Sequence, residues 1–327
     1  MDTARSSASI AQQVSPPKLP APAIHPLPPT APMAAAPTQP EGPLARLLRN
    51  PETSLKLTAE QLGPYLVQNQ RSAESLLAAF RLTGDLAFLS QADQAFPSNV
   101  MVQTELALRS EDETERRHAI DAMRRADPAN ALGDYLSAHD HLRHGRSQQA
   151  FEDLLAAAGK TQFDDYSLNA MQTAEEAYLA TGFSPVEAKA AAMIGLQRQQ
   201  IQPMRSLAQQ LQDLHQGYLN AGDTASAASI RQMGSALGRQ MQHTAGYLID
   251  ELSGIAIQKQ FLDPATDSAR HLELTQRLDS IKRSLEGDPI RLLQNMDAPE
   301  AIAYFDRLKL YGESTAMQWL RQRHEQR

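Results

Sequence analysis

Residues 131–158 read ALGDYLSAHDHLRHGRSQQAFEDLLAAA, and this pattern predicts two helices joined at a glycine. Apolar residues recur at helical spacing as far as His141, and a second helical run begins after Gly145. Glycine often ends a helix in the left-handed backbone conformation, because it has no Cβ atom that would oppose that conformation. The stretch therefore predicts a helical hairpin with Gly145 at its turn.

The same turn pattern occurs elsewhere in the chain. A ring-bearing residue, three further residues and a glycine occupy 80–84, 141–145, 178–182 and 218–222, and a weaker copy with leucine in place of the ring occupies 308–312. We expect each ring to pack on the last turn of the first helix. Residues suited to starting the return helix follow at Asp85, Ser147, Ser184 and Asp223. The sequence thus predicts an all-α fold of stacked antiparallel helical hairpins.

Other local signals support helices and close packing. Helix starts are predicted where a capping residue precedes Glu or Gln by three positions, at Thr58 and Gln61, Ser184 and Glu187, and Asp297 and Glu300. Gly234 and Gly238 lie four residues apart, a spacing that favours close approach of a second helix. Trp319, the only tryptophan, is expected to anchor the last helix to the core.

Two copies of the hairpin extend into the pattern of the tetratricopeptide repeat (TPR). The small and apolar positions of that repeat fall on Ala138, Gly145, Ala150, Leu154 and Ala157 in one copy, and on Leu211, Leu214, Tyr218, Gly222, Ala227 and Gly234 in the other. The chain therefore resembles TPR-like helical-repeat proteins over about 128–160 and 207–236. It departs from the family at Asp134, where a large residue is expected. The resemblance implies a right-handed α-solenoid with a concave surface that binds a protein or peptide.

The resemblance also implies which residues bind the partner. The family positions that face the concave surface correspond to Tyr135, His139, Arg143, Gln216 and Asn220. The family's carboxylate-clamp residues are not reproduced, so chaperone C-terminal tails are not the expected partners. The expected function is a non-enzymatic protein–protein interaction scaffold.

Three segments are predicted along the chain. Residues 1–42 include PPKLPAPAIHPLPPTAP at 16–32, and proline this frequent prevents both helices and sheet ladders, so we expect a disordered tail or linker. TPR-like repeats are expected over 43–160. Further helical hairpins are expected over 161–327, either continuous with the first set or forming a separate bundle.

The histidines of HDHLRHG, residues 139–145, define an alternative function. His141 and His144 are three residues apart and share a helix face, as do Asp140 and His144, which are four apart. The region of His139, His141 and His144 could therefore hold a metal ion or serve an enzyme. A structural role is preferred because His141 occupies the packed ring position of the hairpin and His144 lies at a helix end, where positive charge is favourable. We therefore predict no catalytic, cofactor or metal site. The absence of cysteine excludes thiolate ligands and cysteine nucleophiles.

Charge and hydropathy limit the partners further. The net charge of −7 and the absence of a dominant basic patch argue against nucleic acid. No apolar run approaches the roughly 20 residues of a membrane-spanning helix. No signal peptide is recognised either, so we expect a cytoplasmic protein, unless a late start-codon assignment conceals an upstream anchor. A third hypothesis is a structural subunit of a larger, envelope-associated assembly.

Overall fold

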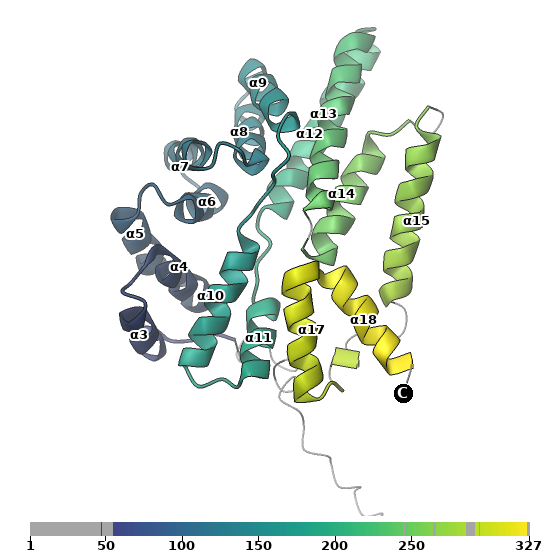
Figure 1. Cartoon of the computed structure of the whole chain (residues 1–327). Helices are drawn as coiled ribbons and strands as arrows, with labels where there is room; N and C mark the ends of the chain where they lie inside the picture. Colours follow the sequence, from purple (N-terminus) through teal and green to yellow (C-terminus); the bar gives the residue numbers. More distant parts are fainter. Residues whose placement is uncertain are drawn as a thin grey trace, which may run out of the picture. The chain divides into compact units, whose positions relative to one another are not determined.

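The computed structural model of the chain describes Leu47 and residues 55–244, 246–263, 266–285, 292–293 and 295–325. Contacts divide the chain into two units, Met1–Pro40 and Glu41–Arg327. The segment expected to be a disordered tail, residues 1–42, lies outside the described residues. Every helix with defined bounds belongs to the second unit (Figure 1).

The described part of the chain is all-α and contains no β-strand, which confirms the predicted class. Its fifteen helices are α3 (Ala59–Gln68), α4 (Ala73–Thr83), α5 (Leu86–Ala95), α6 (Val100–Arg109), α7 (Glu113–Ala126), α8 (Ala131–Arg143), α9 (Ser147–Ala158), α10 (Ser167–Ala180), α11 (Pro185–Ile194), α12 (Ile201–Asn220), α13 (Thr224–His243), α14 (Leu248–Gln260), α15 (Ser268–Leu285), α17 (Ala298–Tyr311) and α18 (Glu313–Glu325). None of the helices in the described residues is both long and apolar enough to span a membrane.

Five of the glycines that the structure describes have positive φ angles, and all five are the predicted turn glycines. They are Gly84, Gly145, Gly182, Gly222 and Gly312, with φ between 71° and 93°. Each lies between two helices that contact each other: α4 and α5, α8 and α9, α10 and α11, α12 and α13, and α17 and α18. The local hairpins are therefore as the sequence predicts.

The predicted helix starts are also present. Thr58 and Ser184 form capping boxes, in which the side chain at the N-cap and the side chain three residues later each accept from the other's backbone amide. The Asp297 side chain caps α17 by accepting from the amide of Glu300 at 2.8 Å. The start of α9 differs from the prediction: Ser147 is its first helical residue, and Arg146 is the N-cap without a side-chain cap.

The order of the hairpins in space is not their order in sequence. After α9, the chain crosses back so that α10 packs against α3 and α4, and after α11 it crosses again so that α12 packs against α8 (Figure 1). Hydrogen bonds fix the first return, because the Tyr178 hydroxyl donates to the Leu55 carbonyl at 2.7 Å and the Tyr65 hydroxyl donates to the Thr173 carbonyl at 3.3 Å. We call 159–166 and 195–200 the crossing connections.

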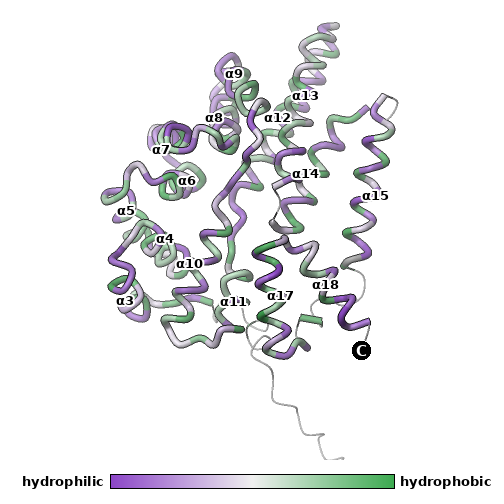
Figure 2. The backbone as a smooth tube through the Cα atoms, viewed as in Figure 1, coloured by the Kyte–Doolittle hydropathy of each residue, from purple (hydrophilic) through white to green (hydrophobic). Residues whose placement is uncertain are grey.

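Apolar side chains form two main clusters, and each draws on distant parts of the chain. One combines α3, α4 and α5 with α10, α11, α17 and α18, and the other combines α6 to α9 with α12, α13 and α14. Figure 2 shows green and purple alternating along the helices, as expected for helices with one buried face. Trp319 is partly buried against the first cluster, as predicted.

The glycine pair on α13 allows the predicted close approach. A Cβ atom at Gly238 would lie 2.7 Å from the Gly254 carbonyl oxygen and from the Gln258 amide nitrogen, both in α14. At Gly234 a Cβ atom would lie 2.4 Å from the ring of Phe261. Both glycines therefore serve helix packing.

Candidate functional site

Helix α8 carries three of the predicted binding residues, and the crossing connection covers the first of them. Tyr135 has no exposed surface, and its ring lies 6.2 Å from the ring of Phe163, measured between centroids. Phe163 belongs to the connection that follows α9. A partner could contact Tyr135 only if these neighbours moved, so its present role is in the core.

The other two residues on α8 reach the surface. His139 is half-buried and Arg143 is exposed, and they lie one turn apart. Both line a hollow between α6, α7, α8 and the first turn of α12, where Pro203 completes the wall. The structure therefore places His139 and Arg143 together and separates them from Tyr135.

Gln216 and Asn220 are exposed on the last turns of α12. An open groove of about 550 Å³ lies on the same part of this helix. Its lining residues come from α8, α9 and α12 and from the turn after α12: Leu142, Ser147, Gln210, Asp213, Leu214, Gly217, Tyr218 and Ala221. We call this surface the α8–α12 groove. Gln216 and Asn220 are next to it in sequence but do not line it.

The α8–α12 groove is mainly apolar, and glycine contributes to its shape. Leu142, Leu214 and Tyr218 are partly buried and pack against the second apolar cluster, so their positions are fixed. Gly217 is exposed, and a Cβ atom there would meet nothing within 4 Å. Asp213 is the only charged side chain among the described lining residues. The groove can therefore accept an apolar side chain, with weak preference for a neutral or basic neighbour.

The histidine cluster forms part of an ion-pair network between α7, α8 and α9. His141 Nδ1 accepts from Arg146 Nε at 3.0 Å, and His144 Nε2 lies 3.1 Å from a Glu113 carboxylate oxygen. Burial lowers the pKa of His141, and the neighbouring Arg117 lowers it further. Within the described residues, no group of three side chains is arranged to hold a metal ion. His141 and His144 bind different partners and do not converge.

Asp140 is the centre of this network. It is 2% exposed, and three arginines reach it: Arg116 at 3.1 Å, Arg146 at 3.1 Å and Arg117 at 3.7 Å. A buried carboxylate needs such partners, because loss of hydration costs several kcal/mol for an ion in a real protein. These contacts tie Arg146, the residue before α9, to α8.

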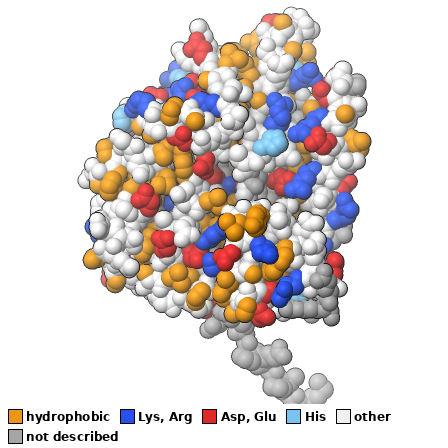
Figure 3. Space-filling view, in the orientation of Figure 1, with side chains coloured by type: hydrophobic (Ala, Val, Ile, Leu, Met, Phe, Trp, Pro, Cys, Tyr) orange, Lys and Arg blue, Asp and Glu red, His pale blue; other side chains and the backbone are white. Residues whose placement is uncertain are grey.

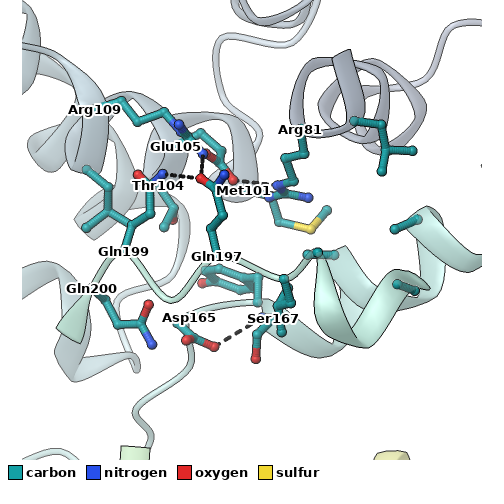
Figure 4. A pocket seen from close by; sticks show the side chains of 18 of the residues that line it. Arg81, Met101, Thr104, Glu105, Arg109, Asp165, Ser167, Gln197, Gln199 and Gln200 are labelled. Atoms are coloured by element: carbon teal, nitrogen blue, oxygen red, sulfur yellow. Dashed lines mark hydrogen bonds and ion pairs between the residues drawn. The ribbon is translucent and has the colours of Figure 1, made fainter. Parts of the chain in front are cut away.

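Sequence reasoning missed a cavity between the two halves of the fold. The cavity has a volume of about 50 Å³, enough for a few water molecules. Alanines of α10 and α11 line it, and polar groups of α4, α6 and the second crossing connection complete it (Figure 4). These elements are distant in sequence, so no local pattern could have predicted the cavity.

Glu105 is the central charged group of this cavity. Arg81 Nε lies 2.6 Å from one of its oxygens and Arg109 Nε lies 2.7 Å from the other (Figure 4). Burial alone would raise the pKa of Glu105, but the two guanidinium groups hold it below its ordinary value. Arg109 also donates to Gln197 Oε1 at 3.2 Å and so connects α6 to the crossing connection. We interpret this cluster as a structural junction.

Charged side chains of both signs are interspersed over the face shown in Figure 3. Comparison of the chain with protein-family models, curated proteins and solved structures gave no match.

Proposed function

We propose that this protein is a non-enzymatic interaction scaffold of the helical-repeat type, and that the α8–α12 groove binds a segment of a partner protein. The observation that carries the proposal is the open apolar groove beside Gln216 and Asn220, two of the residues that the TPR resemblance implies for partner binding. In this reading, the hairpins from α3 to α9 form a short TPR-like solenoid, and the later helices pack onto it.

The occupant that fits the groove is a partner segment with one large apolar side chain. Leu142, Leu214 and Tyr218 provide the apolar surface, and burying such a side chain contributes about 1.5–3 kcal/mol. Asp213 at the edge favours a neutral or basic residue beside the anchor, since an acidic one would be repelled. Gln216 and Asn220 offer amide groups that can bind the partner's backbone.

Substitution of Gly217 by Trp tests the proposal. The new side chain starts in open space, so it should leave the fold intact while its ring covers the groove. The matched control is Ser229→Trp, because Ser229 is exposed on α13 and does not line the groove. Both proteins are compared with wild type by circular dichroism before binding is measured.

Partners that the wild-type chain captures from cells are purified. The dissociation constant of each partner is then measured with the wild type and with both variants. We expect Gly217→Trp to weaken binding at least about tenfold, which corresponds to about 1.4 kcal/mol. Ser229→Trp should bind as wild type does. A partner that binds all three proteins equally would exclude the α8–α12 groove as its site.

A further inference from the structure

The hollow beside His139 and Arg143 is distinct from the α8–α12 groove. Its volume is about 310 Å³, and its walls come from α6, α7, α8, the connection between α6 and α7, and the first turn of α12. We call it the arginine pocket, because Arg109, Arg116 and Arg143 line it. The two surfaces share no lining residue.

Two groups in the arginine pocket have no partner among the described residues. Within the described part of the chain, Arg143 makes no hydrogen bond or ion pair, and it is exposed at the end of α8. His139 Nε2 is buried and has no hydrogen-bond partner among the residues that the structure describes. A buried polar atom without a partner is unfavourable, and a bound ligand is one way to satisfy it.

The other charges leave the arginine pocket with excess positive charge. Arg116 is held in place by Asp140 and by the Ser110 carbonyl, to which Nη1 donates at 3.1 Å. Asp140 is also shared with Arg117 and Arg146, so its carboxylate is already occupied by cations other than Arg143. The remaining acidic residue of the lining is the exposed Glu111.

Arg109 has its own carboxylate partner outside the lining, because its Nε lies 2.7 Å from Glu105. Among the described lining residues, the guanidinium of Arg143 is therefore the cation without a carboxylate partner. A guanidinium presents a planar pair of donors that matches the oxygens of a carboxylate or a phosphate.

We propose that the arginine pocket binds a small oxyanion, with Arg143 at the entrance and His139 Nε2 inside as its two contacts. The site is independent of the proposed partner groove. The oxyanion can be a phosphate or a carboxylate, and both offer the oxygens that these two side chains require.

The pKa of His139 can report anion binding at this site. Burial, followed by the charges of Arg143 and Arg116, lowers the pKa of His139 to about 4, and Asp140 opposes the shift. Arg109 on α6 and Glu111 after it are the other charged groups of the lining, and Pro203 of α12 carries no charge. A bound oxyanion favours the protonated imidazole, so it must raise the pKa of His139. Affinity is then lowest at high pH and rises as the pH falls through the pKa of the bound form.

The experiment titrates the full chain with inorganic phosphate and, separately, with acetate, by calorimetry at constant ionic strength. Arg143→Ala should weaken binding at least about tenfold. Arg125→Ala is the matched control, because Arg125 is exposed on α7 outside the pocket, and it should change affinity less than twofold. Saturation by phosphate alone or by acetate alone would identify which oxyanion the site accepts.

Proton NMR then measures the pKa of His139 with and without the anion, and its signal is assigned by its loss in His139→Gln. At one fixed anion concentration, near the dissociation constant of wild type, we expect a rise in the pKa of His139 in wild type and a clearly smaller rise in Arg143→Ala. The proposal is overturned if neither anion binds, if Arg143→Ala and Arg125→Ala bind equally, or if the pKa of His139 does not change.

Discussion

Single glycines determine where the hairpins turn. All five ring–glycine or leucine–glycine copies in the sequence have a glycine with positive φ in the structure. A residue with a Cβ atom loses roughly 1–2 kcal/mol in the left-handed conformation. These positions could be predicted because the requirement is local and depends on one residue and its own helix.

Replacement by alanine should have opposite effects at a turn glycine with positive φ and at a glycine inside a helix. Gly84→Ala places a Cβ atom at φ 77° and should destabilise the protein by about 1–2 kcal/mol. Gly217 lies within α12 with open space around it, so Gly217→Ala should stabilise the protein by up to about 1 kcal/mol. Urea unfolding measures both, and a shift of the two midpoints in the same direction would contradict the assignment of these backbone conformations.

At the scale of elements, hairpins form locally, but their contacts are set by small residues on particular faces. The sequence indicated that Gly234 and Gly238 allow another helix to approach. It did not indicate which helix, because any helix with a small facing residue could have done so. In the structure the neighbour is α14, whose Gly254 faces Gly238.

The α13–α14 contact predicts the cost of a single methyl group. Gly238→Ala would place the new Cβ atom 2.7 Å from two backbone atoms of α14, and backbone cannot move aside as a side-chain end can. We expect a loss of about 1–3 kcal/mol in the free energy of unfolding. Ser229→Ala, exposed on the same helix, should stay within about 0.5 kcal/mol of wild type. Equal effects in a denaturation series would show that the two helices are not in close contact.

At the scale of the whole described unit, the crossing connections join the two halves of the chain. Arg198 in the second connection pairs with Asp165 in the first at 2.9 Å, and it also binds Asp250 of α14. Its guanidinium lies 4.7 Å from the centre of the Tyr247 ring. The boundary expected at residue 160 does not separate two cores, since both main clusters draw residues from both sides of it.

This arrangement predicts that residues 43–160 do not fold alone. Without the rest of the chain, Tyr135 loses Phe163, and α3 and α4 lose their contacts with α10. Residues 41–327 should unfold in one cooperative transition that circular dichroism and tryptophan fluorescence report at the same denaturant concentration. A cooperative transition in the isolated 43–160 fragment would show that the first hairpins are an independent domain.

For the predicted binding residues too, part of the outcome depends on local sequence and part on contacts between distant segments. His139, Arg143, Gln216 and Asn220 reach the surface, and their role in binding stays a prediction. The repeat position predicted that Tyr135 lies on an open concave face. That position alone could not reveal that a later segment of the chain covers this face. The cavity around Glu105 had no local signal, because its polar groups come from α4, α6 and a crossing connection.

The sequence by itself determined the helical class, several helix caps and the five hairpin turns, because each depends on residues within a few positions of one another. Only the tertiary structure decided that α10 returns to α3 and α4, and that α12 lies on α8. It also decided which of the predicted binding residues stayed exposed. The physical reason is that apolar helix faces attract one another without direction, so many pairings satisfy the same hydrophobic pattern. Close packing across the whole unit selects among them.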